Sequence, residues 1–223
     1  MGAPRDSGIG RRVTAAEIEA AVVGASLPPL ARRAALQFEA YLRLLLRWNA
    51  KFNLTAVREP SEIVRRHFLE CIQCAHALPK AATLLDFGSG AGLPGIPIAI
   101  VCPEIRVTLG ESQGRKVAFL REAVRVLDLT AEIYDGRIEK MPAGRVFEAV
   151  ALRAVDRMAD ACREATRRLK AGGSLIAFAT SKTGPGLHSA SQGIKWKPPL
   201  PITGLDDAFL LIGEKEDVSR GTP

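Results

Sequence analysis

The chain has 223 residues, 47% of them hydrophobic, which is enough to bury one globular domain with a modest extension. Its 31 Lys and Arg residues outnumber 24 Asp and Glu residues and give a formal net charge of +7, which favours an anionic partner and allows nucleic acid. No apolar run is long enough to span a bilayer and the N-terminus lacks a signal-type apolar core, so we expect a cytoplasmic protein without a membrane partner.

The first third of the chain is predicted to be helical. Residues 1–12 show no periodicity and are predicted to be a mobile tail, and residues 13–80 a helical extension. Thr14 is followed three residues later by Glu17, the spacing of a capping box that begins a helix. Apolar residues recur every three or four positions over residues 32–52, and a further helix is predicted over 61–78. The apolar stripe of the 32–52 helix consists of Leu36, Tyr41, Leu44, Leu45 and Trp48.

Two cysteines form a C-x-x-C pair within the predicted helix 61–78. Cys71 and Cys74 have His76 nearby, but no second pair completes a zinc site. Reduced cysteines commonly fill the packed face of a helix. We therefore interpret the pair as part of the core and predict no metal site.

From residue 82 onward, short apolar runs alternate with helical segments, as in a parallel sheet covered on both faces. We predict an α/β, doubly wound domain over residues 81–215, followed by a tail over 216–223. Helices are predicted at 116–127 and over the segment from Arg157 that ends in Gly172-Gly173, read as a C-cap, and a mobile loop at 182–193. The predicted strands are 83–87, 105–110, 131–135, 147–152, 174–179 and 208–215.

A glycine-rich turn follows the first predicted strand and is the main functional signal. The glycines Gly88, Gly90 and Gly92 lie where the carboxyl edge of a doubly wound sheet binds ligands, and they let the backbone approach one closely. A dinucleotide fingerprint would need glycine where Leu93 stands, and a phosphate-binding loop would need G-K-[ST]. With Glu111 ending the second strand, the spacing matches S-adenosylmethionine-dependent methyltransferases, although a ribose-binding carboxylate alone does not exclude NAD.

The stretch LLDFGSGAGLPGIPIAIVCPE (84–104) resembles the signature of the bacterial small-subunit ribosomal RNA guanine-N7 methyltransferases, the RsmG family, also called glucose-inhibited division protein B. Similar segments follow the family's order, and the similarity covers roughly residues 40–182. The resemblance implies a Rossmann-like, class I methyltransferase sheet, S-adenosylmethionine as cofactor, and N7 methylation of a guanine in the 530-loop region of 16S ribosomal RNA near the decoding site. The other matching segments are 53–70, 111–123, 136–141 and 152–155.

The resemblance also implies roles for individual residues. Glu111 would bind the cofactor's ribose, Arg153 would lie beside both cofactor and target base, and Arg137 near the same cleft. His67 and Glu70 fall where the family has histidine and aspartate, and we expect them to order the helical segment against the core. Arg153 and Arg137 are the candidate catalytic residues, and the candidate cofactor-binding residues are Gly88, Ser89, Gly90, Leu93, Glu111, Ile138, Glu139 and Arg153.

The chemistry fits the implied acceptor. Guanine N7 carries a lone pair and no proton, so methyl transfer mainly requires positioning. Methyltransferases of exocyclic amines often carry a D/N-P-P-Y/F motif where this chain reads ALRAV, and a cytosine-5 enzyme needs a cysteine nucleophile, whereas Cys162 lies in a predicted helix. Three alternatives stay open: a small-molecule methyltransferase, a non-catalytic RNA- or nucleotide-binding module, and a nicotinamide oxidoreductase.

The expected partner is 16S ribosomal RNA or the small ribosomal subunit, bound by a monomer. Aromatic residues make up only 5% of the chain, so we expect binding to follow phosphate position and RNA shape. The candidate RNA-binding residues are Arg65, Arg66, Arg115, Lys116, Arg163, Arg167, Arg168 and Lys170.

Overall fold

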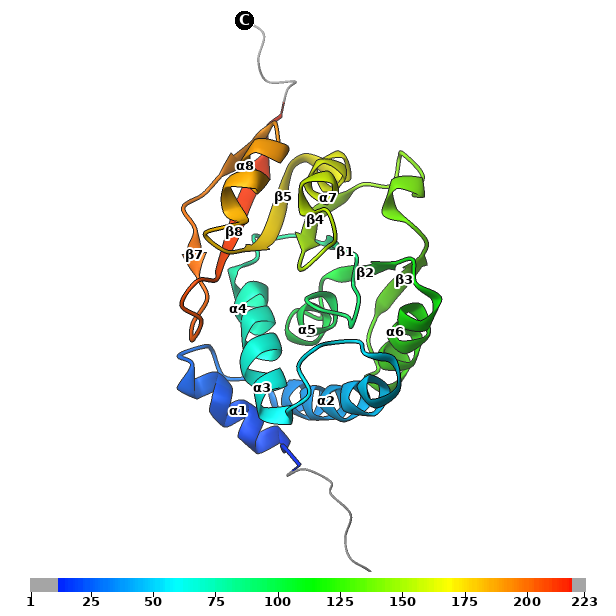
Figure 1. The fold of residues 1–223 in the computed structure, drawn as a ribbon, viewed down its shortest axis with the longest axis vertical. Helices are drawn as coiled ribbons and strands as arrows, with labels where there is room; N and C mark the ends of the chain where they lie inside the picture. Colours follow the sequence, from blue (N-terminus) through cyan, green and yellow to red (C-terminus); the bar gives the residue numbers. More distant parts are fainter. Residues whose placement is uncertain (1–11, 218–223) are drawn as a thin grey trace, which may run out of the picture.

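A mixed eight-stranded sheet forms the centre of the computed structural model, which describes residues 12–217 (Figure 1). Seven strands follow the order β3-β2-β1-β4-β5-β8-β6, and β7 pairs with β8 outside this order. The strands β3, β2, β1, β4 and β5 are parallel, and β8 runs antiparallel to β5, β6 and β7. The strands are β1 Thr83–Phe87, β2 Arg106–Glu111, β3 Ala131–Asp135, β4 Phe147–Leu152, β5 Leu169–Ala179, β6 Ile194–Trp196, β7 Leu200–Pro201 and β8 Phe209–Lys215.

Helices cover both faces of this sheet, as predicted for a doubly wound fold. Because strand side chains alternate between the faces, Leu84 joins a core shared with α1, α2 and α4–α6, whereas Leu85 joins a second core with α7 and α8. The helices are α1 Ala15–Gly24, α2 Arg32–Phe52, α3 Pro60–Ile63, the π-helical turn η1 Val64–Phe68, α4 Leu69–Ala77, α5 Gly95–Val101, α6 Gly114–Val126, the 3-10 turn η2 Ile138–Lys140, α7 Met158–Arg167 and α8 Gly184–Ala190.

The segment predicted to be helical contains α1 to α4, with two differences in detail. The predicted helix 61–78 is divided into α3, η1 and α4, and one residue of the predicted apolar stripe of α2 is exposed. The capping box forms, since Thr14 Oγ1 accepts a hydrogen bond from the Glu17 amide and the Glu17 carboxylate accepts one from the Thr14 amide. The helix α2 has the predicted bounds, but Leu36 is 51% exposed, so its assignment to the buried stripe is wrong. Leu36 lies two residues, or about 200° around the helix, from the fully buried Phe38.

The extension packs into the same hydrophobic core as the sheet. Tyr41 stacks on Phe68 with a ring-centroid distance of 5.2 Å, and its hydroxyl donates a 2.5 Å hydrogen bond to the Ala91 carbonyl. Tyr41 is fully buried. One side chain of the extension therefore holds the backbone of the glycine turn directly.

The carboxyl-terminal half differs from prediction in several segments. The strand β5 begins at Leu169, before the predicted 174–179, and β6 and β7 were not predicted. The helix α7 ends at Arg167, and Gly172, with φ +70°, lies instead in a register shift of β5 against β4, so the glycine pair is not a C-cap. The predicted mobile loop 182–193 contains α8, whose Leu187 is buried in the second core; its glycines and serines concealed that apolar contact. The predicted tails lie outside the described residues, except Arg12, Glu216 and Asp217.

Candidate active site

The three glycines of the turn adopt backbone conformations that favour glycine. Gly88, Gly90 and Gly92 have φ values of +73°, +55° and +84°. A Cβ added to Gly88 would lie 3.4 Å from a Val155 methyl group, so the turn passes close to the loop after β4. The Ser89 amide donates a 2.9 Å hydrogen bond to the carbonyl of Gly110 in β2, which holds the turn against that strand.

The turn separates two cavities at the carboxyl edge of the parallel strands. One, of about 690 Å³, contains Arg153 and is called the Arg153 cavity; the other, of about 410 Å³, contains Glu111 and is called the Glu111 cavity. Both are lined by Gly88, Lys116, Ala154 and Val155. The predicted cofactor residues divide between them: Ser89, Gly90 and Leu93 line the first, and Glu111, Ile138 and Glu139 line the second.

Backbone amides hold the Glu111 carboxylate. Its Oε2 accepts a hydrogen bond from the Gly90 amide at 2.9 Å, and its Oε1 accepts from the amides of Ser112 at 2.8 Å and Gln113 at 2.9 Å. Glu111 is only 7% exposed. A carboxylate has about four acceptor positions, so one remains on Oε2 for a ligand hydroxyl.

The 3-10 turn η2 forms the wall of the Glu111 cavity. Ile138 is buried against β2, and a Cβ on Gly110 would lie 2.4 Å from its Cδ1, so the Ile138 side chain packs directly against the backbone of Gly110. Arg137 and Glu139 flank Ile138 and are exposed. Arg137 lines only the Glu111 cavity, and the structure therefore does not bring the two candidate catalytic arginines together.

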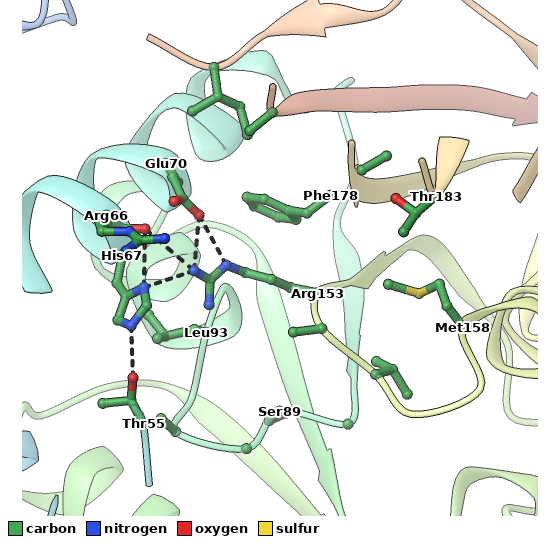
Figure 2. Close-up of a pocket in the computed structure, with 18 of the residues that line it drawn as sticks. Thr55, Arg66, His67, Glu70, Ser89, Leu93, Arg153, Met158, Phe178 and Thr183 are labelled. Carbon is green, nitrogen blue, oxygen red and sulfur yellow. Dashed lines mark hydrogen bonds and ion pairs between the residues drawn. The ribbon is translucent and has the colours of Figure 1, made fainter. Parts of the chain in front are cut away.

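Side chains from the helical extension hold Arg153 at the end of β4 (Figure 2). Its Nε and Nη2 donate to Glu70 Oε2 at 3.3 and 2.9 Å, and Nη2 lies 2.8 Å from His67 Nδ1 and 3.4 Å from the Arg66 carbonyl oxygen. The guanidinium carbon also lies 5.6 Å from the centroid of the Phe178 ring. Within residues 12–217 the third nitrogen, Nη1, forms no hydrogen bond, and it carries no dashed line in Figure 2.

The same contacts define the state of His67, which lies in the π-helical turn η1. His67 Nδ1 lies 2.8 Å from Arg153 Nη2 and 3.0 Å from the Arg66 carbonyl oxygen, and Nε2 lies 2.9 Å from Thr55 Oγ1. Because an arginine only donates and its contact is the shorter one, we assign the proton to Nε2, so that Nδ1 accepts from Arg153 and Nε2 donates to Thr55 Oγ1. Burial, together with the charge of Arg153, lowers the pKa of His67 to about 4. His67 is therefore neutral at physiological pH, and the lone pair of its Nδ1 is used by the hydrogen bond from Arg153.

An unpaired carboxylate oxygen lies under the glycine turn. Asp86 is 1% exposed; its Oδ2 accepts from the Gly95 amide at 3.0 Å, whereas Oδ1 has no partner among the described residues. Burial raises the pKa of Asp86 to about 7. The acid is thus poised between its neutral and charged forms near neutrality.

The cysteines of the chain are free thiols whose pKa values are raised by burial. Burial raises the pKa of Cys71 and Cys74 well above the usual range and that of Cys162 to about 11. These thiols are therefore protonated near pH 7 and are poor nucleophiles. Within residues 12–217 no cluster of three or more His, Cys, Asp or Glu side chains could hold a metal ion, and no helix there is long and apolar enough to cross a membrane.

The predicted basic surface is smaller than the sequence indicated. Arg168 is buried and paired with Glu164 at 2.7 Å, so its assignment to an RNA-binding surface is wrong. Arg65, Arg163, Arg167 and Lys170 each pair with a carboxylate of this chain. Of the predicted series, Arg66, Arg115 and Lys116 have no ion-pair partner among the described residues, and Arg66 and Lys116 line the Arg153 cavity.

Sequence reasoning missed several residues that line the Arg153 cavity. Phe178 and Thr183 come from the end of β5 and the start of α8, and Thr55 comes from the loop after α2. Phe178 could have been found, because ligands bind beyond the carboxyl ends of parallel strands and β5 ends at Ala179. Thr55 and Thr183 carry no such signal, because only the tertiary fold brings them to the cavity.

Comparison with solved structures matches this fold to methyltransferases. The N-methyltransferase NodS from Bradyrhizobium japonicum WM9, solved with S-adenosyl-L-homocysteine, has a TM-score of 0.58 and 14% identity over 80% of this chain and 100% of its own. A methyltransferase from Pyrococcus furiosus also has a TM-score of 0.58, with 17% identity over 80% of this chain and 97% of its own. These similarities confirm the predicted class I methyltransferase fold.

Relatives found by sequence have higher identity to this chain than these solved structures. The relative named ribosomal RNA small subunit methyltransferase G in Stenotrophomonas maltophilia strain K279a is 42% identical over 152 residues, covering 68% of each chain. The relative of that name in Xanthomonas campestris pv. campestris strain B100 is 44% identical over 182 residues, covering 79% of this chain and 84% of its own. The family model described as rRNA small subunit methyltransferase G matches residues 34–192, a range that includes Glu111 and Arg153. The chain therefore belongs to that family.

Proposed function

We propose that this protein is an S-adenosylmethionine-dependent methyltransferase that acts on N7 of a guanine in 16S ribosomal RNA, in the 530-loop region near the decoding site. Family membership supports the enzyme class and the RNA, and the resemblance of the glycine turn supports the position methylated. The observation that carries the proposal is the arrangement of two neighbouring cavities that share Gly88 as a lining residue, with a fixed carboxylate in one and a fixed guanidinium in the other.

The residues around Gly88 fit the cofactor. The free acceptor position on Glu111 Oε2 suits one ribose hydroxyl, and binding both hydroxyls would require the Gly90 amide to release that oxygen. Ile138 offers an apolar surface for the adenine beside Glu139, and the turn at Ser89, Gly90 and Leu93 would contact the amino acid part. When bound, the cofactor supplies an electrophilic methyl group on a sulfonium.

The Arg153 cavity suits an acceptor that needs no deprotonation. Its carboxylate, Glu70, is paired with Arg153, and its imidazole, His67, is neutral and already accepts from Arg153. Neither group is free to act as a general base. Guanine N7 attacks through its own lone pair, so positioning is the main contribution that the protein must make.

Arg153 is the residue that we place beside the target base. Its Nε and Nη2 are used by Glu70, His67 and the Arg66 carbonyl, which leaves Nη1 to donate to O6 of the guanine while N7 stays free. Arg137 lines only the other cavity, so we assign it to the cofactor side. The enzyme would work as a cytoplasmic monomer on ribosomal RNA or on the small subunit.

The decisive experiment maps methylated guanines in ribosomal RNA from cells that lack and cells that express this protein. We expect one guanine to lose its N7 methyl group in the absence of the protein and to regain it on expression. Labelled methyl transfer to small subunits, compared with transfer to metabolite mixtures, separates this function from that of a small-molecule methyltransferase. Cofactor binding without any transfer would identify a non-catalytic module.

An Arg153→Ala protein tests the role of the guanidinium. We expect cofactor affinity to stay within about threefold of the unmodified protein, whereas kcat falls by about a hundredfold, because one charge-assisted hydrogen bond to the reacting base contributes about 2 to 3 kcal/mol. Isothermal titration measures the affinity and single-turnover methylation measures the chemical step. Normal turnover would remove the role that we assign to Arg153.

A further inference from the structure

An exposed aromatic side chain lies at the carboxyl end of α2. Phe52 is 41% exposed although it is a large apolar residue. Its ring centroid lies 5.2 Å from that of Trp48, and the guanidinium of Arg115 lies over the Phe52 ring at 5.8 Å from the centroid. Phe52 and Arg115 together form a ring and a planar cation on the surface, which we call the Phe52–Arg115 platform.

The platform borders the Arg153 cavity. Phe52 is followed closely by Leu54 and Thr55, and Arg115 is followed directly by Lys116. Leu54, Thr55 and Lys116 all line that cavity. Figure 1 shows the carboxyl end of α2 beside α6, and these helices are in contact. A nucleic acid strand with one base in the Arg153 cavity would thus pass within reach of the platform.

The charges around the platform favour a polyanion. Lys51, Arg115 and Lys116 form no ion pair with any carboxylate of residues 12–217. Leu36 provides the contrast on the same helix. It is also exposed and lies beside Arg32 and Arg33, but the cavity that these residues line shares no residue with the Arg153 cavity, and Arg33 is paired with Asp128 at 2.9 Å. Exposed apolar residues alone need no explanation, whereas an aromatic ring with unpaired cations at the rim of a cavity does.

We propose that the Phe52–Arg115 platform stacks an unpaired RNA base next to the target guanine. Every base has a face that stacks on an aromatic ring or on a guanidinium plane, so the contact adds affinity with little dependence on sequence. Lys51 and Lys116 bind the flanking phosphates. This inference rests on the proposed function because it takes RNA as the substrate, and it adds stacking to the phosphate and shape recognition expected from the composition.

The test uses the full chain and small ribosomal subunits from cells that lack it. Phe52→Leu keeps an apolar side chain against Trp48 but removes the ring, Phe52→Trp keeps a ring, and Leu36→Ala is the matched control on the same helix. Subunit binding is measured at equilibrium with S-adenosylhomocysteine present, and KM and kcat are measured for methyl transfer. We expect Phe52→Leu to weaken subunit binding and raise KM about tenfold, with kcat and cofactor affinity unchanged.

The controls separate stacking from folding and charge. Phe52→Trp should restore the affinity, Leu36→Ala should match the unmodified protein, and Lys51→Gln should reduce the salt dependence of binding by about one phosphate contact. If Phe52→Leu binds subunits as tightly as the unmodified protein, the platform proposal is wrong. If the unmodified protein binds subunits without methylating them, the proposed function fails, and the binding comparison still decides the platform.

Discussion

Two charged side chains of the site, Glu111 and Arg153, are fixed in different ways. The carboxylate of Glu111 is held by three main-chain amides within 21 residues of it. The guanidinium of Arg153 is held by side chains of Glu70 and His67, which lie 83 and 86 residues earlier in the chain. One position depends on the path of the backbone, and the other depends on distant side chains meeting correctly.

This difference predicts how each charge responds to substitution. Main-chain donors are present whatever side chain their residue carries, so the Glu111 position should tolerate changes around it. Buried side-chain networks lose their geometry when one member changes, so the Arg153 position should be sensitive to its neighbours. The glycine turn would then lie between a cavity whose charged group tolerates substitution of its neighbours and a cavity whose charged group does not.

The largest effect is expected from removing the backbone-held carboxylate itself. Glu111→Ala leaves the amides of Gly90, Ser112 and Gln113 without their acceptor, and we expect the free energy of unfolding to fall by about 2 to 4 kcal/mol. The affinity for S-adenosylmethionine should fall at least a hundredfold, as measured by isothermal titration. Glu132→Ala, which removes an exposed carboxylate paired with Arg145, is the control. Unchanged cofactor affinity would remove Glu111 from the binding site.

A smaller but still large effect is expected when the support of Arg153 changes. Glu70→Gln retains the shape of the side chain but removes its charge, and we expect kcat to fall by about tenfold and the free energy of unfolding by about 2 kcal/mol. Cofactor affinity should change little. The control Glu62→Gln removes the partner of Arg65 in an exposed pair and should cost less than about 1 kcal/mol without affecting kcat. Equal effects of both variants would contradict a positioning role for Glu70.

Asp86 is buried under the glycine turn between the two cavities, and its titration predicts how the stability of the protein depends on pH. Its pKa is about 7 in the folded protein against 3.8 ordinarily, so the folded state binds more protons between these values, and this group's contribution to stability is lost as pH rises through 7. Asp86→Asn keeps an acceptor for the Gly95 amide but does not titrate, so its stability should depend less on pH. Relative to the unmodified protein, the variant should gain stability as pH rises to 7 and above. Unfolding midpoints at pH 5 to 8 measure it.

His67 changes stability in the opposite direction over nearly the same pH range. Its pKa of about 4 in the folded protein lies below the ordinary 6.5, so the unfolded chain binds more protons between these values and stability falls as pH falls through this range. Both the unmodified protein and Asp86→Asn should share this loss. If the two proteins have parallel pH profiles from 5 to 8, Asp86 has no raised pKa.

The smallest effect is expected from changing a side chain whose amide holds Glu111. Ser112→Ala retains the main-chain N–H that donates to Glu111 Oε1, so cofactor affinity should change less than twofold. The same assay used for Glu111→Ala measures it. A tenfold loss would show that the hydroxyl, and not the backbone, supports that half of the site, and would break the distinction between the two charges.

The same contrast between local main-chain contacts and contacts of distant side chains explains which features the sequence could predict. The strand bounds of β1, β3 and β4, the helix α2 and the glycine turn follow from local periodicity and spacing, which adjacent residues determine. The pairing of Glu70 with Arg153 and the approach of Thr55 and Phe178 depend on how distant elements pack, and no local pattern encodes that. Likewise, Leu187 stabilises α8 through a tertiary contact that the glycine-rich composition of its segment concealed.

The hydrogen bond from Tyr41 to the Ala91 carbonyl ties the amino-terminal helices to the glycine turn. A version trimmed to begin at the first strand would lose Tyr41 and Phe68, uncover the Phe119 ring that lies 6.5 Å from the Tyr41 ring, and remove the hydrogen bond that holds the glycine turn. We therefore expect that this enzyme cannot serve as a portable cassette grafted onto another RNA-targeting scaffold. Any transplant must carry the residues from α1 onward.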